Sequence, residues 1–170
     1  MSALDPQVQA ALIGLLGGLV GGLVSWYIQK HKFKQEMVKA IFPRIQKACG
    51  ELWEVTPHLK ISDARGENTV LWRGEDGQAY LNVAAAKSLQ GNIAEFFRKS
   101  DAAYIPPAIR VAIFTARDYM MTVVEENPDM ADIPISNKRA KRIQDGFGWV
   151  RGLIRKTLDE IIKGELPPLR

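Results

Sequence analysis

Cysteine and histidine are scarce in this chain of 170 residues. Cys49 is the only cysteine, so the chain forms no intrachain disulfide and needs no oxidising compartment. His31 and His58 are the only histidines, too few for the usual zinc sites, and we expect no metal and no cofactor. The phosphate-loop, HExxH and GxSxG motifs are also missing. These absences predict a protein that is not an enzyme.

Charge is missing from the beginning of the chain. All 23 Lys and Arg residues follow position 29, and Asp5 is the only charged residue before it. The stretch from Ala10 to Ile28 is apolar or small throughout, and as a helix it would be about 28 Å long. We therefore expect residues 1–29 to form an N-terminal transmembrane anchor and residues 30–170 to form a separate helical domain.

Aromatic and basic residues follow this stretch in the order typical of a membrane surface. Because the cations lie only on its C-terminal side, the N-terminus is expected outside and the domain in the cytoplasm. The sequence thus predicts a single-pass protein of the cytoplasmic (inner) membrane. The residues expected at the membrane surface are Trp26, Tyr27, Lys30, Lys32 and Lys34.

The small residues of the N-terminal segment fall on one face when they are projected on a helix. Leucines and Val20 fall on the opposite face. In lipid, a face of small residues lets two helix backbones approach closely, so we expect this segment to make the protein a homo-oligomer. Glycine is also common in membrane helices that do not associate. The interface residues are Gly14, Gly17, Gly18, Gly21, Gly22 and Ser25.

Beyond the anchor, apolar residues recur at helical spacing and predict an all-α fold, a bundle of about four helices. The first continues the anchor to Pro57, with a kink or a new start at Pro43. The second covers about 78–98, the third runs from Pro107 to about 126, and the fourth begins near Ser136. The alternative for this region is a short hairpin, formed by TVLW and QAYL on either side of GEDG. The core residues expected in the last two helices are Ile109, Ile113, Ala116, Met120, Val123, Ile143, Phe147, Val150, Ile154, Leu158 and Ile161.

Basic residues gather on the fourth predicted helix. Four of them crowd its first turns, and the next two follow at a spacing of four residues. We expect them to form a stripe that contacts phosphate, lipid headgroups or an acidic partner. The alternative is a solvated face balanced by Asp145, Asp159 and Glu160. The basic residues are Lys138, Arg139, Lys141, Arg142, Arg151 and Arg155, all but Lys141 being candidate ligand-binding residues.

A second candidate lies in the long segment between Pro57 and Gly77. Trp72 is followed by Arg73, with Arg65 nearby, and a guanidinium beside an indole can hold a flat anionic ligand such as a nucleotide. The alternative is that Trp72 packs against the helices while the charged side chains face water.

The glycine-rich span ending in SWYIQKHKFKQEM resembles small bacterial membrane proteins, some of them from antiphage loci. The layout is also similar to the membrane-anchored ancillary effectors of type III CRISPR systems. That resemblance implies a cytoplasmic helical domain that oligomerises and binds cyclic oligoadenylate. It covers only the anchor and its junction, and it carries over no functional residue.

Two functions follow as hypotheses. In the first, the protein is a non-enzymatic effector or sensor. It self-associates through the glycine-rich helix, binds a nucleotide second messenger or nucleic acid, and perturbs the membrane, as in antiphage defence. In the second, it is a membrane-tethered scaffold that recruits a cytoplasmic protein partner.

Overall fold

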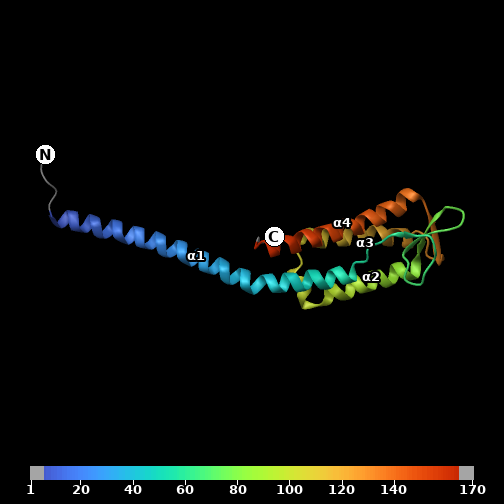
Figure 1. Cartoon of the computed structure of the whole chain (residues 1–170), viewed down its shortest axis with the longest axis horizontal. Helices are drawn as coiled ribbons and strands as arrows, with labels where there is room; N and C mark the ends of the chain where they lie inside the picture. The colour runs from blue at the N-terminus through green and yellow to red at the C-terminus, as the bar shows by residue number, and fades with distance from the viewer. Residues whose placement is uncertain (1–5, 165–170) are drawn as a thin grey trace. The chain divides into compact units, whose positions relative to one another are not determined.

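The computed structural model describes residues 6–164, apart from the side chains at positions 6–13, 16, 17, 34, 37 and 100. The chain divides into two compact units, Met1–Ala40 and Ile41–Arg170. The elements in chain order (Figure 1) are α1 (Pro6–Val55), β1 (Ile61–Ser62), β2 (Leu71–Arg73), β3 (Ala79–Asn82), α2 (Val83–Arg98), the 3-10 helix η1 (Ser100–Tyr104), α3 (Pro107–Glu125), β4 (Asp132–Ile135) and α4 (Asn137–Ile162).

A four-stranded mixed sheet in the order β1-β2-β3-β4 lies at one end of α2, α3 and α4 (Figure 1). β1 is parallel to β2, and the other two pairs are antiparallel. One face of the sheet is buried. Leu71, Leu81 and Ile133 are paired side by side across β2, β3 and β4, and all three are buried. Pro134 lies in β4, an edge strand, where the missing N–H of proline is tolerated. The sheet therefore adds its apolar face to the helical core.

The sheet contradicts the predicted all-α fold. The hairpin alternative is the correct one, since β2 and β3 pair across the GEDG turn. In that turn Gly77 has φ +75°, which glycine adopts without strain, and Asp76 accepts a hydrogen bond from the Gln78 N–H (2.9 Å). Residues 78–82, read from the sequence as the first turn of a helix, belong mostly to β3.

Helices α2, α3 and α4 begin at favourable residues. The Asn82 side chain caps α2 by accepting a hydrogen bond from the Ala85 N–H (3.2 Å), and Ser136 caps α4 in the same way from Arg139 (3.2 Å). Pro107 occupies the first turn of α3, where no N–H is needed. The buried faces of these helices hold nearly all the predicted core residues, Leu158 being half-buried.

The structure also corrects the predicted membrane anchor. Among the described residues, no helix combines the length and the apolar character that crossing a bilayer requires. Glycines at 14, 18, 21 and 22 lower the apolar character of this helix, because they add no apolar side chain. For this part of the chain, the transmembrane helix, its single-pass topology and the inner-membrane localisation are therefore wrong.

Candidate functional site

The predicted basic stripe of α4 does not exist as one surface. Arg151 turns toward the end of α1, where its Nη1 donates hydrogen bonds to the carbonyls of Trp53 (3.3 Å) and Thr56. Its guanidinium carbon lies 3.5 Å from the centroid of the Trp53 ring. Arg142 instead lies over the ring of Tyr119 on α3, at 4.5 Å. The two arginines therefore contact different helices.

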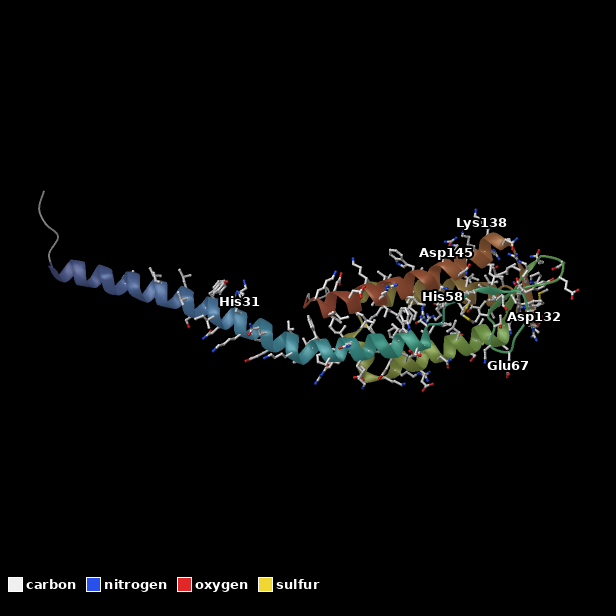
Figure 2. All side chains as sticks on the ribbon, viewed as in Figure 1. His31, His58, Glu67, Asp132, Lys138 and Asp145 are labelled. Carbon is white, nitrogen blue, oxygen red and sulfur yellow. The ribbon has the colours of Figure 1, made fainter. Side chains whose placement is uncertain are left out.

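The other predicted cations are exposed. Arg139 forms an ion pair with Glu126 (3.0 Å), whereas Lys138, Arg155 and Arg73 are solvent-exposed. Figure 2 shows Lys138 at the beginning of α4 and Asp145 further along the same helix. Of the six cations predicted to bind a ligand, only Arg142 lines the large groove described below.

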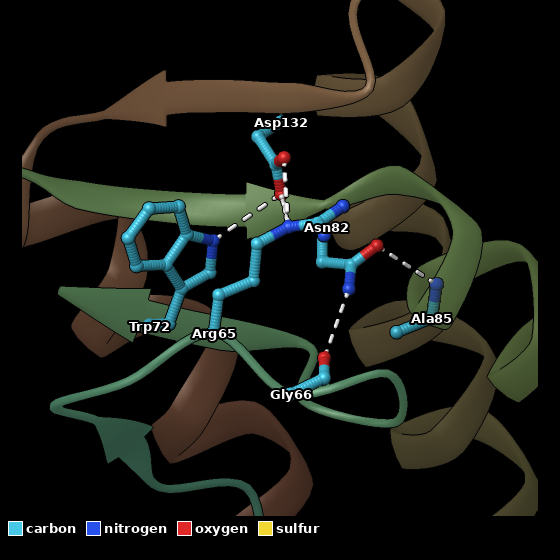
Figure 3. A network of polar contacts seen from close by, with 6 residues as sticks. All are labelled: Arg65, Gly66, Trp72, Asn82, Ala85 and Asp132. Atoms are coloured by element: carbon cyan, nitrogen blue, oxygen red, sulfur yellow. Dashed lines mark hydrogen bonds and ion pairs between the residues drawn. The ribbon is translucent and has the colours of Figure 1, made fainter. Parts of the chain in front are cut away.

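Trp72 belongs to a polar network on the outer face of the sheet (Figure 3). Its indole N–H donates to Asp132 Oδ1 (3.3 Å), and its ring stacks on Tyr80 with centroids 4.7 Å apart. Asp132 also pairs with Arg65 (2.9 Å). The indole thus has an aromatic neighbour on one face and a carboxylate at its N–H. The guanidinium that completes this cluster comes from Arg65 and not from the predicted Arg73.

Asn82 joins the same end of the sheet to α2 (Figure 3). Its amide donates to the Gly66 carbonyl (3.3 Å) while its side-chain oxygen caps the helix. Asn82 is buried, and these two contacts use both ends of its amide group. Asn82 therefore links the segment at Gly66 to the beginning of α2.

A groove with a volume of about 820 Å³ lies between α3 and α4. The two helices approach closely there, since a Cβ built on Gly146 would lie 3.2 Å from the Cβ of Ala116. Most of the remaining wall is apolar. The lining residues are Ala108, Val111, Ala112, Thr115, Ala116, Tyr119, Arg142, Asp145, Gly146, Trp149 and Leu153.

Two apolar residues of this groove are unusually exposed for their size. Trp149 on α4 and Val111 on α3 each retain 66% of their accessible surface. Scattered exposed apolar residues are normal, but here they share one concave surface with a guanidinium and a carboxylate. The sequence reading missed Trp149 and Val111, because single residues on a polar helix face give no periodic signal.

The described N-terminal part of α1 exposes its large apolar side chains. Leu15, Leu19 and Leu23 retain 57–65% of their surface. On the opposite face, a Cβ built on Gly14, Gly18, Gly21 or Gly22 would meet no atom of the chain within 4 Å. The surroundings of Gly17, another predicted interface residue, lie outside what is described, while Ser25 is exposed.

The residues predicted to mark a membrane surface form local pairs along this helix. Lys30 Nζ lies 5.0 Å from the Trp26 ring, and Tyr27 contacts His31 with ring centroids 4.4 Å apart. Lys32 is exposed, and the side chain of Lys34 lies outside the described ones.

Cys49 is buried among the core residues of α1, and burial raises the pKa of its thiol to about 12. A thiol in this state is a poor nucleophile, because the thiolate is the reactive form. Within residues 6–164, as far as their side chains are described, no three His, Cys, Asp or Glu residues gather as metal ligands would.

Comparison of the chain with protein-family models, with curated proteins and with solved structures found no match.

Proposed function

We propose that this protein is a non-enzymatic, self-associating binding protein. Copies assemble through residues 14–28 of α1, and the domain of residues 41–164 binds an anionic ligand. The observation that carries this proposal is the exposure of Leu15, Leu19 and Leu23 on a helix segment that has apolar or small residues on every side.

Exposed apolar surface of this extent favours association. Full burial of a leucine or valine side chain stabilises by about 1.5–3 kcal/mol, so covering several per chain offsets the entropy of assembly. A helix that is apolar all round belongs in a core with neighbours on more than one side. Each copy can offer its glycine face to one neighbour and its leucine face to another, which favours assemblies of more than two helices.

The ligand-binding part of the proposal is supported by the cations of α4. Lys138 and Arg142 are exposed, and within the described part of the chain neither of them forms an ion pair. Lys138 and Arg142 lie near the N-terminus of α4, where the helix dipole adds positive potential. An anionic ligand is the natural counterpart of such a surface.

Gly18→Leu tests the assembly. The single chain has open space at this position, and leucine favours the helix more than glycine by about 0.8 kcal/mol, so the variant folds. Against a close neighbour helix the added side chain overpacks the contact by about 1–3 kcal/mol. We expect light scattering to give a defined oligomer for the wild-type chain and a smaller species for the variant.

Gly91→Leu is the matched control, because Gly91 is an exposed helical glycine of α2 with the same open surroundings. It should leave the mass unchanged. A monomeric wild-type protein, or an oligomer that Gly18→Leu does not affect, would contradict self-association through this segment. The exposed surface would then point to a different protein as the partner.

A further inference from the structure

We propose that the α3–α4 groove binds a nucleotide, a planar aromatic molecule that carries both an anionic group and N–H donors. This inference rests on the proposed anion-binding function and specifies its site and its ligand class. Three side chains of α4 carry it, Arg142, Asp145 and Trp149, all of which line the groove.

The spacing of these residues places them on one face of the helix. Positions i, i+3 and i+7 differ by at most about 60° around the axis, and seven residues rise about 10 Å. A guanidinium, a carboxylate and an indole therefore follow one another along the groove. This length is comparable to that of a nucleotide from its base to its phosphate.

Arg142 provides the anion-binding end. Its guanidinium carbon lies 4.5 Å from the centroid of the Tyr119 ring, and both side chains line the groove. In the described part of the chain Arg142 forms no ion pair, even with Asp145 one turn away on the same face. Lys138, one turn earlier on α4, adds positive charge at this end.

Trp149 provides a stacking surface at the other end. Its indole is mostly exposed, and it shares the groove with small side chains of α3 and with the exposed Val111. Bases stack on such rings with little dependence on their identity, and every base has a face to offer. The small residues Ala112, Ala116 and Gly146 line this groove and leave the space that a ring would fill.

Asp145 lies between Arg142 and Trp149 on α4 and restricts which ligands the groove can bind. An ionised carboxylate only accepts hydrogen bonds, so it favours a ligand with N–H donors and disfavours one with a second anionic group at that point. The exocyclic amine of an adenine or cytosine base meets this requirement, whereas a fatty acid or free phosphate does not. The groove volume of about 820 Å³ is also within the usual range for small-molecule sites.

Calorimetric titration of the full chain with adenosine monophosphate tests the site, with adenosine and inorganic phosphate as separate arms. We expect saturable binding of the nucleotide and weaker binding of either part alone. Arg142→Gln should weaken nucleotide binding by about tenfold or more and leave adenosine binding nearly unchanged. Trp149→Ala should weaken both by about tenfold, because stacking is lost.

Arg155→Gln is the matched control, since Arg155 is an exposed arginine of the same helix outside the groove, and it should change affinity by less than about twofold. Absence of nucleotide binding up to about 1 mM, or phosphate binding as tight as the nucleotide, would overturn the proposal. So would a loss of oligomer mass in Trp149→Ala without any nucleotide binding, which would make the groove a contact between copies. The Gly18→Leu variant should still bind the nucleotide, so failure of the assembly and failure of the site are distinguishable.

Discussion

Replacing Arg151 by alanine should destabilise the domain of residues 41–164 by roughly 3–4 kcal/mol. The side chain donates from Nη1 to two carbonyls in and just after the last turn of α1, those of Trp53 and Thr56. Such carbonyls have no partner within their own helix. A hydrogen bond from a charged donor contributes about 1.5–3 kcal/mol, and a cation–π contact about 0.5–2 kcal/mol. Because Arg151 is only half-buried, the lower ends of these ranges apply.

Urea denaturation followed by tryptophan fluorescence, to which Trp53 contributes, measures this loss. At about 3–4 °C per kcal/mol for a domain of this size, the melting temperature should fall by roughly 10 °C. Arg155→Ala, one turn further along α4, should stay within about 0.5 kcal/mol of wild type. Arg151→Lys should be intermediate, since it keeps the charge but not the planar fork. If Arg151→Ala is as stable as the control and loses only affinity for an anionic ligand, Arg151 does not stabilise the end of α1.

Two further predictions concern buried groups near the same end of α1. Burial raises the pKa of the Cys49 thiol in the folded state to about 12, against an ordinary value of 9.0. Between these pH values unfolding releases the thiol proton, so the free energy of unfolding should fall as the pH rises above 9. Cys49→Ala should abolish this part of the decline in urea midpoints, and the native thiol should resist alkylation at pH 8 until the chain unfolds; fast labelling of the folded protein would contradict the burial. Among the described residues, the buried Oγ1 of Thr56 has no hydrogen-bond partner. Thr56→Val keeps the shape of the side chain and should therefore raise the free energy of unfolding by about 1 kcal/mol, whereas a loss of similar size would show that the hydroxyl is satisfied.

The helices that sequence periodicity identifies best are those with the strongest one-sided patterns. The helix expected from Pro107 to about 126 is α3 (Pro107–Glu125), and the helix expected from Ser136 is α4, with Ser136 as its N-cap. In both, the residues of the predicted apolar stripe are buried, apart from the half-buried Leu158. In the helix expected to continue the anchor, Phe33, Ile41 and Ile45 recur at a helical spacing, but Phe33 is exposed whereas Ile45 is buried. Periodicity shows which side of a helix is apolar, but it does not show whether anything covers that side.

The sheet escaped prediction because its strands are only two to four residues long and two of them adjoin helices. β3 runs directly into α2, so Leu81 of the strand and Ala85 of the helix fit one helical stripe. The local signal was Asn82, a capping residue that marks the start of the helix at Val83. In β4, Ile133 and Ile135 alternate with Pro134 and Asp132, a pattern too short to identify a strand without its partner.

In the candidate site, the spacing of residues within α4 can be predicted from the sequence, whereas the contacts between α3 and α4 cannot. Arg142 and Arg151 are nine residues apart, and nine steps of 100° amount to half a turn beyond two full ones. The prediction of one stripe that contains both was therefore wrong on helix geometry alone, which puts them on opposite sides of α4. The spacing of Arg142, Asp145 and Trp149 on one side is equally readable. The α3 side of the groove cannot be predicted in this way, because Tyr119 and Val111 belong to another helix. Their register against α4 depends on the close contact of Gly146 with Ala116. A Cβ at position 146 would lie 3.2 Å from that of Ala116, tighter than an ordinary contact, so Gly146→Ala would require the two helices to shift by a few tenths of an ångström and would alter the groove between them.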